Sequence, residues 1–333
     1  MQCMQHQYIE RDSGTPRSEP LFGDRLIGLL YHRVREHAPS LFRMVTSPRM
    51  TDVLGFVNYD LPFGASSSAC SKFLRELKVD LGECLDPPGQ LNTPRKVFER
   101  RIRYETCRPM PADAGSVVSP ADARVLVGSL RDTSSLFIKD KFFTFAELLG
   151  EQLWLEAFQE GDFALFRLTP DKYHYNHAPV TGQVLDIYQI DGAFNSCNPN
   201  AIVAVATPYS KNRRVVTIID TDVPGGTGVG LVAMVEVVAL MIGDIVQCYS
   251  EHGYDEPQEV VAGMFIEKGQ PKSLYRPGSS TDIIIFQQGR VEFAGDLREN
   301  QRRTDVVSRF SHGFNQSLVE TDIRVRSLLA TAV

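Results

Sequence analysis

The sequence has few of the features that mark several common protein classes. Its six cysteines are scattered and form no Cys-x-x-Cys pair, so neither a zinc site nor a disulfide framework is predicted, and we expect reduced thiols. The net charge of −6 at pH 7 argues against nucleic-acid binding. The longest apolar stretch, residues 231–242, is interrupted by Glu236 and is too short to span a bilayer.

The start of the chain also lacks a targeting pattern. Residues 1–7 contain no basic segment followed by an apolar core, so the sequence predicts no secretory signal. With 43% apolar and 23% charged residues, the chain can bury a sizeable core, as soluble enzymes do. We expect a protein that is cytoplasmic or peripheral on the cytoplasmic membrane face.

The pattern of apolar residues divides the chain into two parts. Residues 22–84 carry apolar residues at helical spacing, and a short basic helix is expected around residues 93–103. After Pro111 the pattern changes to short apolar runs between turn residues, at 125–127, 184–187, 201–205 and 215–219. The sequence therefore predicts an α+β fold, with a mostly helical N-terminal region at 1–111 and a β-rich catalytic domain at 112–333.

A cluster of small residues near the C-terminus is the main candidate for chemistry. Gly278, Ser279 and Ser280 precede the apolar run 283–286, and such a turn can hold a strained peptide bond beside a serine hydroxyl. Ser280 could then attack the carbonyl of Ser279, and elimination and hydrolysis would leave a pyruvoyl group on the new chain end. Taken alone, the cluster has ordinary turn chemistry and predicts a β-turn between strands.

Several ordered blocks of the chain resemble the phosphatidylserine decarboxylase family, in particular its bacterial branch with the longer N-terminal region. They include a Ser-Pro-x-Asp block, a Tyr-His-x-x-His-x-Pro block and an apolar segment ahead of the serine cluster. In chain order the blocks are residues 8–11, 26–31, 97–102, 108–109, 119–122, 173–179 and 232–245. The resemblance runs from near one end of the chain to near the other.

The resemblance implies roles for four residues. His177 would be the general base that takes the proton of Ser280, and Asp122 would fix the imidazole to complete an Asp-His-Ser arrangement. His174 would position the substrate carboxylate or relay a proton. The two histidines could otherwise be structural, and prolines on both sides leave little room for the helix that a metal site at this spacing needs.

The spacing of the family motif also selects the serine. The interval from Ser280 to Phe286 matches the interval between the cleaved serine and a strand phenylalanine, so Ser279-Ser280 is the expected scissile bond. Cleavage between Gly278 and Ser279 is the alternative. Ser279 stands where one form of the motif has a second glycine, and its Cβ narrows the accessible backbone conformations.

The function implied by the resemblance is a self-processing decarboxylase with its own pyruvoyl cofactor. It would convert phosphatidylserine to phosphatidylethanolamine and CO₂ through a Schiff base with the substrate amine. Val238 and Asp244 depart from the family pattern and favour an alternative, the decarboxylation of a soluble amino acid such as an aromatic one. A further alternative is an unprocessed Asp-His-Ser hydrolase or a lipid-binding protein.

The resemblance also suggests partners. Residues 22–45 and the basic run from Arg95 to Arg103 could lie on an anionic membrane surface, although a solvated helix face explains the same charges. A homodimer of processed two-chain protomers is expected from the family.

Overall fold

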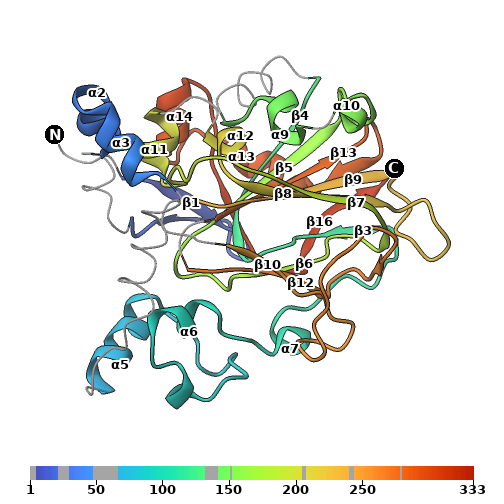
Figure 1. Cartoon of the computed structure of the whole chain (residues 1–333), viewed down its shortest axis with the longest axis horizontal. Helices are drawn as coiled ribbons and strands as arrows, with labels where there is room; N and C mark the ends of the chain where they lie inside the picture. Colours follow the sequence, from blue (N-terminus) through green and yellow to red (C-terminus); the bar gives the residue numbers. More distant parts are fainter. Residues whose placement is uncertain are drawn as a thin grey trace.

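A computed structural model describes residues 5–21, 30–47, 67–131, 142–150, 152–204, 208–239, 244–277 and 280–333. Its main element is a ten-stranded sheet (Figure 1). The strands lie in the order β11 (Phe265–Ile266), β7 (Gly182–Ile190), β8 (Arg214–Asp220), β9 (Leu231–Val237), β13 (Ser280–Phe286), β5 (Asp162–Leu168), β4 (Ala123–Ser129), β15 (Thr321–Ile323), β1 (Gln7–Glu10) and β2 (Thr15–Ser18).

Two three-stranded sheets pack near this large sheet. One has the order β10 (Ile245–Gln247), β12 (Pro271–Tyr275), β6 (Tyr175–His177), and the other β14 (Val291–Phe293), β16 (Leu328–Ala332), β3 (Ser116–Val118). With 23% helix and 32% strand, the protein is strand-rich and mixed, which confirms the coarse part of the predicted fold class.

Strand β13 lies in the middle of the large sheet and is buried along its whole length. It pairs with β9 on one side and β5 on the other, both antiparallel. Its side chains alternate: Ile284 packs in the core shared with the small sheets, and Ile283 packs on the opposite face. Ser280 and Asp282 therefore share the face of Ile284, toward the small sheets.

Helices cover the opposite face of the large sheet. Aromatic and aliphatic side chains from these helices form its second apolar core, and each fully buried large side chain contributes about 1.5–3 kcal/mol. The helices are α9 (Phe145–Leu149), α10 (Gln152–Phe158), α11 (Pro199–Ala204), α12 (Pro208–Lys211) and α14 (Arg309–Phe314), while α13 (Gly295–Gln301) packs against β4.

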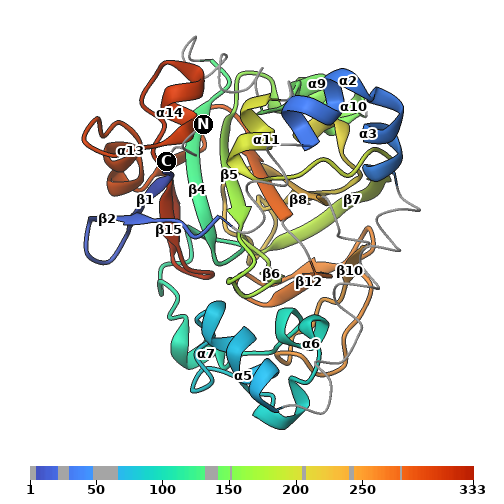
Figure 2. The ribbon, with the colours of Figure 1, turned by 90° about the vertical axis from the view of Figure 1, so that its left-hand side faces the viewer.

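The N-terminal part is only partly as predicted. Helical segments are present at η1 (Leu30–Val34), α2 (Arg35–His37), α3 (Pro39–Val45), α5 (Ser67–Glu76), η3 (Pro88–Gln90), α6 (Pro94–Phe98) and α7 (Tyr104–Cys107). We call residues 67–107 the helical lobe, and Figure 2 shows it beside the β10-β12-β6 sheet.

Two elements differ from what the sequence pattern indicated. Residues 7–18 form β1 and β2, because Ile9 pairs in parallel with Thr321 from the far end of the chain and is fully buried. Residues 201–204 are helical, because the side chain of Asn198 accepts the Asn200 backbone N–H and Pro199 starts the helix. The domain boundary near residue 111 stays a prediction. None of the described helices is long and apolar enough to cross a membrane.

Candidate active site

His177 sits at the end of β6, and its tautomer follows from its contacts. Its backbone N–H donates to the carbonyl of Pro120 at 2.7 Å, which joins the histidine block to the Ser-Pro-x-Asp block. Nδ1 lies 2.7 Å from the carbonyl oxygen of Gly269, which can only accept, so Nδ1 carries the proton. Nε2 then accepts from the hydroxyl of Tyr173 at 2.9 Å. Burial lowers the pKa of His177 to about 3, so the imidazole is neutral.

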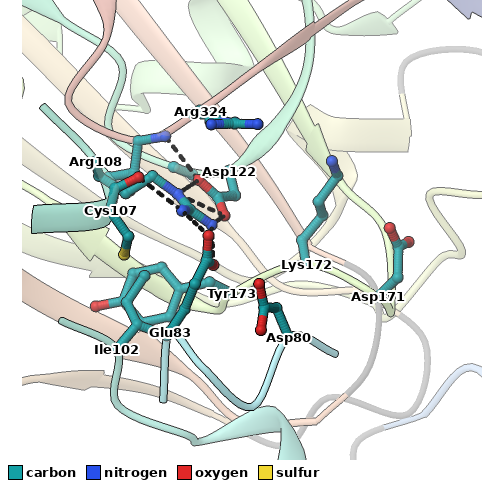
Figure 3. A network of polar contacts seen from close by, with 12 residues as sticks. Asp80, Glu83, Ile102, Cys107, Arg108, Asp122, Asp171, Lys172, Tyr173 and Arg324 are labelled. Carbon is teal, nitrogen blue, oxygen red and sulfur yellow. Dashed lines mark hydrogen bonds and ion pairs between the residues drawn. The ribbon is translucent and has the colours of Figure 1, made fainter. Parts of the chain in front are cut away.

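Asp122 does not contact His177. Its carboxylate accepts hydrogen bonds from Arg108 at 3.0 and 2.8 Å and from the backbone N–H of Val325 at 2.8 Å (Figure 3). Burial opposes ionisation, but the Arg108 guanidinium outweighs it and holds the pKa of Asp122 below its usual value. The expected Asp-His hydrogen bond is therefore absent between these two residues, because Arg108 and a backbone carbonyl supply the partners instead.

Arg108 is a functional candidate that the sequence analysis placed only within an Arg-Pro block. Its guanidinium also donates to both carboxylate oxygens of Glu83 in the helical lobe, at 2.9 and 3.0 Å. Figure 3 shows Arg108 between Asp122 and Glu83. Arg108 thus ties the helical lobe to Asp122, and Asp122 in turn holds the chain at Val325.

Ser280 begins β13 and is fully buried. Its hydroxyl has no hydrogen-bond partner among the described residues, so the structure does not bring it into contact with His177. Gly278 and Ser279, the other two cleavage-site candidates, lie outside the described residues. A buried hydroxyl without a hydrogen-bond partner destabilises a protein in which Ser280 remains a serine. A small ketone suits the position better, because it has no O–H group that needs an acceptor. The residues present therefore fit a pyruvoyl group at position 280.

His174 lies on the same side of the fold. Its Nδ1 is 2.8 Å from the carbonyl oxygen of Lys172, and its ring packs edge-on against Phe98 with centroids 4.9 Å apart. Its backbone carbonyl accepts the N–H of Tyr275, five residues before Ser280. This contact places His174 beside the strand that leads into the serine cluster.

A buried polar cluster on the Ser280 face has no counterpart in the sequence analysis. Glu236 and Lys272 are fully buried and form an ion pair at 2.8 Å, and Glu236 stands directly opposite Asp282 in the sheet. Burial and the Glu236 charge raise the pKa of Asp282 well above its usual value. The only sequence signal for the cluster is an acid within each of two apolar strands.

The contacts of the Tyr275 hydroxyl agree with a neutral Asp282. The oxygen lies 3.0 Å from the Thr281 carbonyl and 2.7 Å from the Asp282 carboxyl, and it accepts the N–H of Val237. Its single proton can serve the Thr281 carbonyl only if Asp282 brings a proton of its own. Asp282, two residues along the strand from Ser280, therefore lies in surroundings that favour its protonated form.

One cluster among the described residues contains metal-ligating residue types, and it lies apart from the residues that share the sheet face of Ser280. His6, Glu19 and Glu320 come close together, but the guanidinium of Arg167 donates to both glutamates at 2.6–2.9 Å. Since the Arg167 guanidinium already balances these carboxylates, we interpret the cluster as a buried ion network that joins the two ends of the chain.

Comparisons with known proteins place the site in a family. A family model described as phosphatidylserine decarboxylase matches residues 95–309. The chain is 26% identical over 295 residues to a phosphatidylserine decarboxylase proenzyme of Fusobacterium nucleatum, covering 88% of this chain and 91% of that protein. It is 27% identical over 292 residues to the proenzyme of Clostridium tetani, with coverage of 87% and 91%.

A plant relative matches over a shorter region. The chain is 30% identical over 245 residues to phosphatidylserine decarboxylase proenzyme 2 of Oryza sativa, covering 72% of this chain and 36% of that protein. The family model spans Arg108, Asp122, His174, His177 and Ser280. The chain therefore belongs to the phosphatidylserine decarboxylase family of carboxy-lyases.

Proposed function

We propose that this chain is a proenzyme that cuts itself between Ser279 and Ser280 and then decarboxylates phosphatidylserine to phosphatidylethanolamine. Relatives named as proenzymes over almost the whole chain support the proposal. The observation that carries it is the Ser280 hydroxyl, which is buried without a described partner at the head of the central strand.

Self-cleavage starts at the Ser280 hydroxyl. Its oxygen bonds to the carbonyl carbon of Ser279, its proton passes to Nε2 of His177, and the peptide nitrogen leaves with a proton, so that the amide becomes an ester. Loss of the Ser280 α-proton then breaks the ester and frees the carboxylate of Ser279. Water replaces the nitrogen as ammonia and leaves a pyruvoyl group. For the first proton transfer, Nε2 of His177 must give up its hydrogen bond with Tyr173 and accept one from Ser280.

The pyruvoyl group would supply an electrophilic carbonyl that takes up the electron pair released when CO₂ leaves. The chain's own residues exclude water and hold protons around it. Asp282, whose pKa is raised well above its usual value by burial and the Glu236 charge, lies on the same strand face, His177 is a neutral base, and His174 lies beside the strand leading to Ser280. A proton donor and a proton acceptor are thus available on this side of the sheet.

The basic run from Arg95 to Arg103 gives little support to association with an anionic membrane. Arg100 is buried, Arg101 pairs with Asp86 at 2.8 Å, and Arg95 pairs with Glu99 at 3.2 Å. These arginines serve contacts within the protein, so they do not form a free cationic face. A membrane-facing role for residues 22–45 stays a prediction, and residues 22–29 lie outside the described part of the chain. The homodimer is likewise a prediction.

The soluble amino-acid alternative is weakened at one of its two residues. Val238 is buried in the apolar core, whereas Asp244 is about half exposed, 3.9 Å from Arg276. A CO₂-release assay separates the substrates. Wild-type protein should release CO₂ from phosphatidylserine vesicles and not from free amino acids, and Ser280→Ala should release none. Release from free amino acids alone would reject the lipid assignment.

A further inference from the structure

The tight turn between β15 and β16 carries an arginine in an unfavourable conformation. Arg326 has φ of +70°, in the left-handed region that disfavours side chains with a Cβ. The turn is held by Ser119, which accepts the Arg326 N–H and donates to the Ser327 carbonyl, both at 2.9 Å. Asp122 accepts the N–H of Val325. Glycine adopts this backbone conformation without strain, so the turn itself does not explain why an arginine stands at position 326.

Two N–H groups of the Arg326 guanidinium have no acceptor among the described residues. Its Nε and Nη1 are buried and make no hydrogen bond among the described residues, and no described carboxylate forms an ion pair with it. Its Cζ lies 4.8 Å from the ring centroid of Tyr104, which accounts for the face of the guanidinium but leaves its N–H groups unused. Glu105 attracts it only through space. A half-buried cation with two buried N–H donors that lack an acceptor can bind an anion.

Arg326 lies next to the proposed base. Gly269, whose carbonyl fixes the His177 tautomer, has φ of +81°, and a Cβ there would come 3.1 Å from Nε of Arg326. Tyr104, beneath the guanidinium, packs edge-on against His177 with centroids 4.8 Å apart. The Arg326 charge also contributes to the low pKa of His177. The idle donors therefore border the same site.

We infer that Arg326 binds the phosphodiester of the lipid headgroup and so selects a phospholipid over a free amino acid. The inference rests on the proposed function. A guanidinium matches the tetrahedral array of phosphate oxygens. The reacting carboxylate is a poorer candidate, because a cation there would stabilise the charged substrate more than the transition state that leads to neutral CO₂. Arg326 also lies beyond residues 95–309, which the family model matches.

Binding of a product headgroup tests the inference without turnover. Processed wild-type protein is titrated by calorimetry with glycerophosphoethanolamine, which carries the phosphodiester, and with ethanolamine, which lacks it. Arg326→Gln should weaken the first ligand about tenfold or more and leave the second unchanged. The matched control is Arg324→Gln, two residues earlier, where an exposed arginine lies 3.4 Å from Asp12 and the expected change is under about twofold.

A second variant separates ligand binding from a structural role. Arg326→Gly relieves the left-handed strain, so it should keep the melting temperature of the wild type while losing headgroup affinity like Arg326→Gln. A lower melting temperature with unchanged affinity would assign Arg326 to folding and overturn the inference. Equal turnover of phosphatidylserine by wild type and Arg326→Gln would also overturn it while the proposed function stands. A wild type that binds the headgroup through Arg326 but releases no CO₂ would instead reject the proposed function.

Discussion

Replacing Arg108 with methionine tests whether its charge pair with Asp122 holds the site together. The two side chains are 9% and 7% exposed, and their closest contact is 2.8 Å. Removing one partner of a buried pair leaves the other charge uncompensated, which costs about 3–5 kcal/mol. We expect the free energy of unfolding of Arg108→Met to fall by this amount at neutral pH. Urea denaturation in a Ser280→Ala background, which keeps the chain in one piece, measures it.

The sign of the pH dependence follows from Asp122. In the wild type its pKa is held below the unfolded value of about 3.9, so its stabilising effect is present above that pH and is lost as the pH falls through the folded value. Without the guanidinium, burial raises the pKa of Asp122, and the carboxyl becomes neutral as the solution is acidified. The deficit of the variant relative to the wild type should therefore shrink from about pH 7 to about pH 4.

The matched control is Arg101→Met. Arg101 pairs with Asp86 at the same 2.8 Å, but its side chain is 43% exposed, so the expected loss is about 0.2–1 kcal/mol. Equal losses for the two variants, or an Arg108 deficit that does not change with pH, would refute the reasoning.

Two further predictions concern buried ionisable groups of the candidate site. Self-cleavage should keep its rate from about pH 8 to about pH 5, because the pKa of His177 is about 3, and a gel time course that falls near the ordinary histidine pKa of about 6.5 would contradict this. Lys272→Met should lower the free energy of unfolding by about 3–5 kcal/mol, because Glu236 is left unpaired, and adding Glu236→Leu should recover most of the loss. Urea denaturation checks both variants, and equal stability of all three proteins would refute the second prediction.

Local patterns predicted much of the sheet but not its ends. Runs such as 215–219 form strands as expected, because a short run of β-branched apolar residues between turn residues favours a strand that is buried on both faces. The strand at residues 7–10 was missed because its partner, β15, lies more than three hundred residues away. A local pattern carries no information about such a pairing.

The site was predicted at the level of blocks and not of contacts. The resemblance to the family's blocks indicated His177, His174 and Asp122, and the structure brings the blocks of His177 and Asp122 together through a backbone hydrogen bond. The partner of His177 Nδ1 is the Gly269 carbonyl, and a backbone carbonyl has no residue signature. The competition between Arg108 and His177 for Asp122 depends on a three-dimensional distance that spacing along the chain cannot supply.

The intact mass of the small chain tests the central claim most directly. The mature protein should contain a chain that begins at position 280 and is lighter than the plain peptide of the same sequence by one ammonia, with an N-terminus blocked by a ketone. Ser280→Ala should remain a single uncut chain. A small chain that starts with a free serine would mean ordinary proteolysis and would contradict the pyruvoyl mechanism, whereas a blocked chain beginning at position 279 would contradict only the choice of Ser280.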